Sequence, residues 1–120
     1  MDHYKLVLPE HLNHYGSLFG GNLLKWIDEV AFITAKLEFP GHRFVTIAMD
    51  NVEFRNRVEQ GEILRFRVEP IHRGNSSVRY QIQVFGTENF ARPDLVLFET
   101  SITFVNIDES GQKQPIQTIR

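Results

Sequence analysis

The spacing of apolar positions divides the chain into a helical part and a strand-rich part. From Leu23 onward, apolar side chains recur every three or four residues, which predicts an amphipathic helix of about five turns. One broad stripe of this helix is apolar, and it consists of Leu23, Trp26, Ile27, Val30, Ile33, Thr34 and Leu37. We expect this stripe to pack against the remainder of the protein.

After the helix the pattern changes to that of β-strands. Four stretches are rich in β-branched and aromatic residues and contain runs of alternation: Phe44 to Phe54, Glu62 to His72, Ser77 to Thr87 and Leu95 to Ile107. In the third stretch, one face carries apolar side chains and the other carries polar ones. This alternation predicts a half-buried antiparallel strand.

Turn-forming residues separate these strands. Arg73 to Ser76 supplies turn chemistry between two long strands, which predicts a hairpin. Further breaks are expected at Glu59 to Gly61 and at Pro93-Asp94, and a short strand over Lys5 to Leu8 is stopped by Pro9. The predicted order is therefore a short strand, one long helix and four long strands.

One long helix beside an antiparallel sheet predicts an α+β fold in which the sheet wraps around the helix and buries its apolar stripe. Such a sheet leaves a long exposed edge that invites pairing with another copy. A homodimer with one continuous sheet is the expected remedy, because closed two-fold symmetry is the commonest form of assembly.

Length and composition indicate a globular protein. The 120 residues, 42% hydrophobic and 23% charged, are enough for one domain spanning residues 1–120, in which residues 109–120 are expected to form a loosely organised tail. No apolar run approaches the roughly 20 residues needed to span a bilayer. The first residues also lack the features of a signal peptide, so we expect a cytoplasmic protein without a membrane partner.

Cysteine content and charge exclude other classes. The chain has no cysteine, which rules out disulfides, thiolate metal sites and a cysteine nucleophile. A formal net charge of -2 gives no overall attraction to nucleic acid. His11 and His14 lie three residues apart, but no third ligand completes a metal site, so no metal is expected.

The most informative segment is the glycine-rich loop Asn13 to Gly21, which leads directly into the helix. Glycines let a backbone approach a ligand closely, and a helix N-terminus presents free N–H groups and a positive dipole end. Further along the helix, Asp28 is the only charged residue in its sector, among Leu24, Ala31, Phe32 and Ala35. A carboxylate in that position suits a general base or nucleophile.

Simpler interpretations exist for both features. Many acidic residues on partly apolar helix faces reach solvent or a neighbouring arginine, and a glycine-rich segment is also an ordinary tight turn. A serine-hydrolase interpretation fails, because Ser17 directly follows Gly16 and does not match the G-x-S-x-G spacing of a nucleophile elbow.

The segment Asn13-His14-x-Gly16-Ser17-Leu18-Phe19-Gly20-Gly21, followed by Trp26 to Ala31, closely resembles the acyl-CoA thioesterase (acyl-CoA hydrolase) branch of the hotdog-fold superfamily. Similar stretches continue through roughly residues 6–108, including Asp50 to Phe54 and Arg73 to Ser77. The resemblance implies a sheet that wraps one central helix and an enzyme that hydrolyses acyl-CoA to a free acid and coenzyme A. It also implies a homodimer or a larger homo-oligomer such as a tetramer or hexamer.

Carried over residue by residue, the resemblance implies that Asp28 is the catalytic carboxylate and that Asn13 positions substrate or water. The backbone N–H groups of Gly20 and Gly21 would polarise the thioester oxygen. In this superfamily the site lies at the dimer interface, so the loop and Asp28 are expected to serve one site from different subunits. Ser17 departs from the threonine or more polar residue expected there, and no catalytic role is assigned to it.

Coenzyme A carries phosphates, and two groups of residues are candidates for binding them. Arg73, Gly74, Asn75, Ser76 and Ser77 offer a cation, turn amides and hydroxyls, although a plain hairpin turn explains them equally well. Arg55 and Arg57 are weaker candidates, since surface arginines are commonly just solvated. No cofactor is expected, because coenzyme A is part of the substrate.

Two rival functions stay open at this level. A hotdog hydratase or dehydratase would act on the same thioesters, but such enzymes usually pair a histidine with the acid, and the helix carries no histidine beside Asp28. A non-catalytic acyl-CoA-binding module would use the same loop without turnover.

Overall fold

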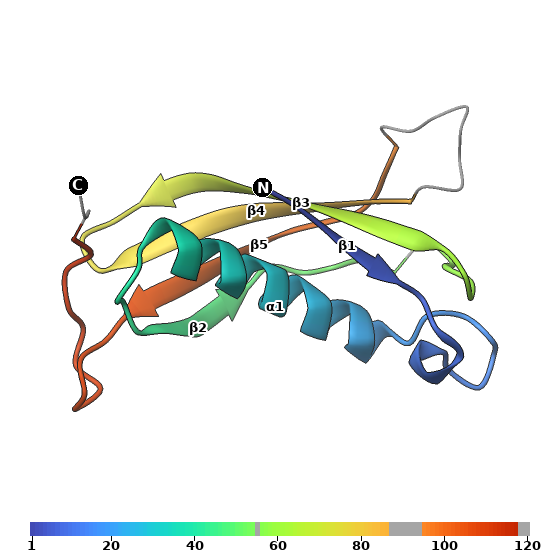
Figure 1. The fold of residues 1–120 in the computed structure, drawn as a ribbon, viewed down its shortest axis with the longest axis horizontal. Helices are drawn as coiled ribbons and strands as arrows, with labels where there is room; N and C mark the ends of the chain where they lie inside the picture. The colour runs from blue at the N-terminus through green and yellow to red at the C-terminus, as the bar shows by residue number, and fades with distance from the viewer. Residues whose placement is uncertain (55, 87–94, 118–120) are drawn as a thin grey trace.

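A computed structural model of the chain describes residues 1–54, 56–86 and 95–117. Within them the fold is one long helix lying across a curved antiparallel sheet (Figure 1). The elements in chain order are β1 (Asp2–Leu6), a short 3₁₀ turn η1 (Pro9–His11), α1 (Gly20–Glu38), β2 (Phe44–Met49), β3 (Ile63–Arg73), β4 (Ser77–Gly86) and β5 (Val96–Asn106). The predicted α+β architecture, with a sheet wrapped on one helix, is confirmed.

The strands are ordered β1-β3-β4-β5-β2, and every neighbouring pair is antiparallel. The hairpin expected at Arg73 to Ser76 is confirmed, because β3 and β4 pair directly across it. A turn also lies at Gln60-Gly61, where Gly61 has a φ of +91° that favours glycine. The strand limits lie within three residues of those predicted, except that β2 ends at Met49 rather than Phe54. Thr87 and the break expected at Pro93-Asp94 lie outside the described residues.

The core lies between α1 and the concave face of the sheet. The expected alternation in β4 is confirmed, since Val78, Tyr80, Ile82 and Val84 are at most 2% exposed. Most of the helix stripe is buried as predicted, but Ile33 and Leu37 remain 39% and 60% exposed. Ala31 and Ala35 are buried instead, because the sheet contacts a face of α1 rotated slightly from the predicted one.

The two ends of α1 have different surroundings (Figure 1). The loop before the helix and η1 gather at its N-terminal end, whereas the β3–β4 turn and the C-terminal segment gather at its C-terminal end. There the buried Tyr80 hydroxyl donates a 2.5 Å hydrogen bond to the Glu38 carboxylate. Burial and this carboxylate together raise the pKa of Tyr80 far above its usual range.

Residues 108–117 fold back onto this end of the sheet. The Asp108 carboxylate accepts hydrogen bonds from the backbone N–H groups of Ser110 and Gln112, and these bonds help lower its pKa. Ile116 is only 7% exposed, and its N–H donates to the Asn75 carbonyl at 2.9 Å. In the described part of the chain, no helix is both long and apolar enough to cross a membrane.

Candidate active site

The loop before α1 is held in shape by Asn13. Its side-chain oxygen accepts hydrogen bonds from the backbone N–H groups of Tyr15 at 2.9 Å and Ser17 at 3.2 Å. The backbone N–H of Asn13 donates to the Ser17 carbonyl. Gly16 closes the loop with a φ of +83°. Asn13 therefore organises the loop through its oxygen, while its Nδ2 group has no hydrogen-bond partner among the described residues.

The helix begins at Gly20 with free amides. The N–H groups of Asn22 and Leu23 donate to the Phe19 carbonyl, but those of Gly20 and Gly21 find no acceptor in the part of the chain that the structure describes. Both glycines allow close packing, because a Cβ atom on Gly20 would lie 3.2 Å from the Phe54 ring and one on Gly21 would lie 2.7 Å from the Phe19 ring. This end of α1 therefore presents two backbone N–H groups that are available to a ligand.

A pocket of about 550 Å³ opens beside Gly20, which is one of its lining residues, whereas Gly21 is not. Its walls come from the loop, the first turn of α1, the connection between β2 and β3, and β5. Most of the lining is apolar, and Asn13, Ser17, Asn56 and Arg57 supply the polar side chains. The lining residues are Asn13, Tyr15, Ser17, Leu18, Phe19, Gly20, Leu23, Phe54, Asn56, Arg57, Val58 and Phe98.

Asp28 lies on the flank of α1 that faces β2. The Thr46 hydroxyl donates a 2.7 Å hydrogen bond to its Oδ1 atom, and the aspartate side chain is half-buried. Ala31 and Ala35 on the same sector of the helix are fully buried. No arginine among the described residues pairs with the carboxylate, which is only partly solvated, and one of its oxygens accepts a hydrogen bond from a neutral donor.

Within one protomer, Asp28 and the Gly20 amide do not belong to the same pocket. Eight residues separate them along α1, which is about 12 Å at about 1.5 Å per residue. Asp28 is also absent from the lining of the Gly20 pocket. A single chain therefore does not bring the carboxylate and the free amides to the separation of about 3 Å that a shared reacting atom requires.

The residues expected to bind coenzyme A are divided between the two ends of the molecule. Arg57 lines the Gly20 pocket, where its guanidinium donates to the Tyr15 carbonyl at 3.0 Å. Arg73 lies at the other end of α1, over the Phe39 ring at 5.1 Å, and donates to the Ile116 carbonyl. Gly74, Asn75, Ser76 and Ser77 form the turn beside it, where the carbonyls of Asn75 and Ser76 accept backbone hydrogen bonds from Ile116 and Asn106. Arg55 lies outside the described residues.

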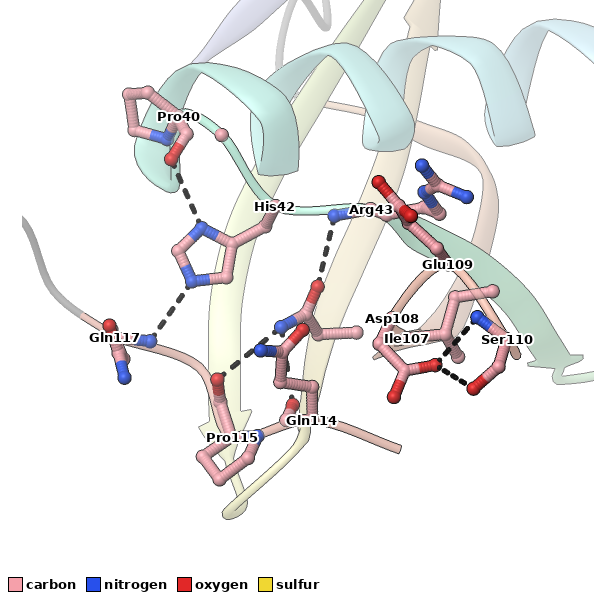
Figure 2. Close-up of a pocket in the computed structure, with 12 residues that line it drawn as sticks. Pro40, His42, Arg43, Ile107, Asp108, Glu109, Ser110, Gln114, Pro115 and Gln117 are labelled. Atoms are coloured by element: carbon pink, nitrogen blue, oxygen red, sulfur yellow. Dashed lines mark hydrogen bonds between the residues drawn. The ribbon is translucent and has the colours of Figure 1, made fainter. Parts of the chain in front are cut away.

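A larger cavity of about 750 Å³ lies at that second end, between the residues after α1 and the C-terminal segment (Figure 2). His42 bridges the two, because its Nε2 atom accepts the Gln117 N–H at 2.9 Å while Nδ1 contacts the Pro40 carbonyl. Asn106 similarly accepts the Arg43 N–H and donates to the Gln114 and Pro115 carbonyls. Much of the polar lining of this cavity therefore forms hydrogen bonds that hold the C-terminal segment in place.

Histidines near the loop have structural contacts. His11 packs edge-on against Trp26 with ring centroids 4.8 Å apart, and its Nδ1 accepts the Leu8 N–H. Over residues 1–54, 56–86 and 95–117, no three histidine, aspartate or glutamate side chains lie close enough together to hold a metal ion.

A cluster at the end of β2 holds the chain that leads to the pocket. The Asp50 carboxylate accepts hydrogen bonds from the Ser101 hydroxyl and from Arg79, the latter at 2.7 Å. The Ser101 hydroxyl, followed by the Arg79 hydrogen bond and charge, lowers the pKa of Asp50. This cluster ties the start of the β2–β3 connection to the convex face of β4 and β5.

Two features of the candidate site were not predicted from the sequence. Thr46 lies in the part of the chain that resembles the thioesterases, but no role was assigned to it. It lies two residues after the buried Phe44, so its polar side chain is on the inner face of β2 and reaches Asp28. Phe54 and Phe98, whose ring centroids lie 6.3 Å apart, were not singled out among ten phenylalanines. Only the fold shows that these rings reach the Gly20 pocket.

Comparison with known proteins identifies similar chains. A family model described as the thioesterase superfamily matches residues 15–89. Mouse acyl-coenzyme A thioesterase 11 is 34% identical over 101 residues, which make up 84% of this chain but only 17% of the mouse protein. The chain thus spans a small part of that relative.

Solved structures of similar fold cover nearly the whole chain. An acyl-CoA hydrolase from Staphylococcus aureus, in complex with butyryl coenzyme A, coenzyme A and coenzyme A disulfide, matches with a TM-score of 0.86 and 28% identity over 100% of this chain and 73% of that one. A hexameric thioesterase from Yersinia pestis matches with a TM-score of 0.84 and 27% identity over 96% of this chain and 93% of that one.

Proposed function

Because this chain belongs to the thioesterase superfamily, we propose that it hydrolyses the thioester of an acyl-CoA to a carboxylic acid and coenzyme A. The observation that carries the proposal is the apolar pocket beside the free amides of Gly20 and Gly21. Such amides stabilise the negative oxygen that develops when a thioester carbonyl is attacked. The names of the mouse, S. aureus and Y. pestis relatives support the same chemistry.

We assign the carboxylate of this site to a second subunit. Asp28 is too far from Gly20 in its own chain, so a complete site combines Asn13, Gly20 and Gly21 of one subunit with Asp28 and Thr46 of another. The free edge of β2 supports this assembly, since β2 is the last strand of the sheet and pairs only with β5 among the described strands. Exposed apolar side chains lie beside that edge, namely Phe32, Ile33 and Leu37 on α1 and Val45 and Ile47 on β2.

The subunits would form a homodimer with a continuous sheet, and dimers would assemble further into tetramers or hexamers. The hexameric state of the Y. pestis relative supports the larger assembly. An antiparallel pair also brings the Arg73 to Ser77 end of one subunit toward the Gly20 end of the other. Arg57 of one subunit and Arg73 of the partner subunit would then bind the phosphates of coenzyme A from two sides.

In the proposed reaction, the Asp28 carboxylate takes a proton from water while the water oxygen attacks the thioester carbon. The carbonyl oxygen becomes negative and accepts hydrogen bonds from the Gly20 and Gly21 amides. The carbon–sulfur bond then breaks, and the proton returns from Asp28 to the coenzyme A sulfur. Direct attack by Asp28 on the carbonyl, followed by hydrolysis of the resulting anhydride, is the alternative. Neither route needs a cofactor.

The contact at Asp28 favours hydrolysis over hydration. Its hydrogen-bond partner is a threonine hydroxyl and not the histidine that a hydratase or dehydratase would use. A binding module would need no positioned carboxylate. Measurement of turnover separates this last alternative from an enzyme.

The test is Asp28→Asn, assayed by release of the coenzyme A thiol. We expect turnover to fall by at least about 10³-fold while the variant keeps its fold, because removing the base or nucleophile abolishes its share of the rate enhancement. Unchanged turnover in a folded Asp28→Asn protein would reject the assignment. If the wild type hydrolyses none of the acyl-CoAs but binds a non-hydrolysable analogue tightly, the result would favour the binding module.

The shared site has its own test. An Asp28→Asn chain and a Gly21→Val chain, each inactive alone, are co-expressed with different tags and purified as mixed oligomers. Mixed dimers keep one site that has both an intact loop and an intact carboxylate, so activity should reappear. Failure of pure, folded mixed dimers to recover activity would reject a site divided between subunits.

A further inference from the structure

We propose that His42 is a positioning residue for the binding of coenzyme A: in its neutral form it holds the Ile116–Gln117 peptide group, which in turn holds the Arg73 guanidinium. The inference rests on the proposed thioesterase function, in which Arg73 binds a phosphate of coenzyme A. It adds a residue remote from the reacting thioester and a dependence on the protonation of that residue.

One peptide group connects the two side chains. The Gln117 N–H donates to the His42 Nε2 atom at 2.9 Å. The carbonyl of the same peptide group, that of Ile116, accepts a hydrogen bond from the Arg73 guanidinium at 3.0 Å. Hydrogen bonds in such a chain polarise one another, so each strengthens the next. Loss of the contact at one end therefore weakens the contact at the other.

The Phe39 ring forms a second link between the same two side chains. The guanidinium carbon of Arg73 lies 5.1 Å from the centroid of this ring, and the His42 imidazole packs edge-on against it with centroids 5.8 Å apart. The buried Ile116 anchors the peptide group, because its N–H donates to the Asn75 carbonyl at 2.9 Å. Ring and peptide group thus give the guanidinium a defined position, and a side chain that is already ordered loses less freedom when it binds a phosphate.

The contacts of His42 require its neutral form. Its Nδ1 atom lies 3.1 Å from the carbonyl oxygens of both Phe39 and Pro40, and a carbonyl can only accept, so Nδ1 carries the proton. The Gln117 N–H can only donate, so Nε2 must present its lone pair. A proton added to Nε2 would place two N–H groups opposite each other and break this contact. Histidine is the side chain that ordinarily changes its charge between pH 8 and pH 5.

The charged side chains of the elements that surround His42 are Lys36 and Glu38 of α1, Arg43, Arg73 of β3, and Asp108, Glu109 and Lys113 after β5. The Glu38 and Asp108 carboxylates accept other hydrogen bonds. Asp108 and Glu109 also lie on the opposite side of the cavity from the imidazole ring (Figure 2). A positive imidazole and the Arg73 guanidinium would repel each other across their shared peptide group, which adds to the loss of the hydrogen bond.

The first experiment follows the link itself, by hydrogen exchange of the Gln117 amide at pH 8 and pH 5.5 in the wild type and in His42→Gln. Glutamine keeps an acceptor oxygen near the position of Nε2 and does not titrate in this range. After correction for the intrinsic effect of pH on exchange, the protection factor of the wild-type amide should fall at least about fivefold at pH 5.5, the effect of one hydrogen bond, whereas His42→Gln should keep its protection. A wild-type amide whose protection does not change with pH, or changes equally in His42→Gln, would overturn the proposal.

The second experiment compares KM and kcat of the two proteins, using the straight-chain acyl-CoA from acetyl to dodecanoyl that the wild type hydrolyses fastest. Titration of the substrate phosphates cancels in the ratio of wild type to His42→Gln. The ratio of KM values should be about 1 at pH 8 and at least about 5 at pH 5.5, while the ratio of kcat values stays near 1, because Arg73 contributes to binding and not to the chemical step. His72→Gln is the control, since His72 is an exposed histidine directly before Arg73, and it should follow the wild type at both pH values.

Replacement of Arg73 tests whether the effect of His42 passes through the guanidinium. In an Arg73→Gln background, KM should be raised at both pH values and His42→Gln should no longer change it at pH 5.5. An undiminished effect of His42→Gln in that background, or a KM that Arg73→Gln leaves unchanged, would overturn the proposal. A wild type that releases no thiol from any of these acyl-CoAs would instead reject the proposed function, and the same comparisons would then be made on the Kd of coenzyme A.

Discussion

The hydrogen bond from Thr46 to Asp28 predicts a specific kinetic defect when the hydroxyl is removed. Thr46→Val keeps the branched shape of the side chain and deletes the donor of the 2.7 Å contact. Hydrogen bonds to charged groups contribute about 1.5–3 kcal/mol when they are well formed. Thr46 is exposed in the described protomer, so water partly replaces the lost donor and the lower limit of about 1.5 kcal/mol applies.

The loss should appear in kcat more than in KM. In the proposed site, the role of Thr46 is its hydrogen bond to Asp28, which acts in the chemical step. Its hydroxyl acts by holding one Asp28 oxygen and thereby aiming the other. A barrier increase of about 1.5 kcal/mol corresponds to a roughly tenfold slower chemical step, since each factor of ten in rate is about 1.4 kcal/mol.

The assay compares kcat and KM of the wild type, Thr46→Val and Thr46→Ser under conditions where the chemical step limits turnover. The serine variant retains the hydroxyl and should recover most of the rate, which a purely structural role of the threonine methyl group would not produce. The reasoning is wrong if Thr46→Val keeps the wild-type kcat, or if the serine and valine variants are equally impaired.

Three further predictions concern stability. Tyr80→Phe removes the buried hydroxyl that donates to Glu38 and should cost about 1–2 kcal/mol, which calorimetry would detect as a Tm lower by about 4–8 °C. The pKa of Asp50 is lower in the folded protein than its ordinary value of 3.8, so on acidification the unfolded chain is protonated first. The contribution of Asp50 to the stability of the fold is therefore present above pH 3.8 and is lost as the pH falls through the folded pKa. Urea titrations from pH 6 to pH 2 should therefore show a shallower decline for Asp50→Asn than for the wild type. His42→Ala deletes the acceptor of the Gln117 N–H, so hydrogen exchange at residues 114–117 should accelerate while that of β4 stays unchanged.

The regular elements were predictable because their cause is local. The periodicity from Leu23 and the alternation from Val78 each reflect burial of one face, and both elements are confirmed. The early end of β2 at Met49 was not predictable from pattern. Val52 and Phe54 continue the apolar alternation, but the Asp50 carboxylate binds Ser101 and Arg79 and directs the chain away from β5. Those partners are at least 29 residues away in the sequence.

The helix stripe illustrates a different limit of the sequence. Ile33 and Leu37 fit the apolar period as well as Leu23 does, yet the sheet of the same chain leaves them exposed. Periodicity records that a side chain is kept from water and does not record which chain covers it. The exposed positions lie beside the free edge of β2, where the proposed partner would cover them.

The candidate site shows the same difference between a local pattern and the partner that completes it. Each component was recognisable alone, since a glycine-rich helix start and an isolated carboxylate both have local signatures. Their local signatures do not indicate joint use; that expectation came only from the resemblance, and within one chain the two lie about 12 Å apart along α1 at about 1.5 Å per residue. If Asp28 and Gly20 act on one substrate, the chemistry requires the assembly, and dilution into monomers should abolish turnover before it unfolds α1. A monomeric form with full activity would be incompatible with this arrangement, whatever the effect of replacing Asp28.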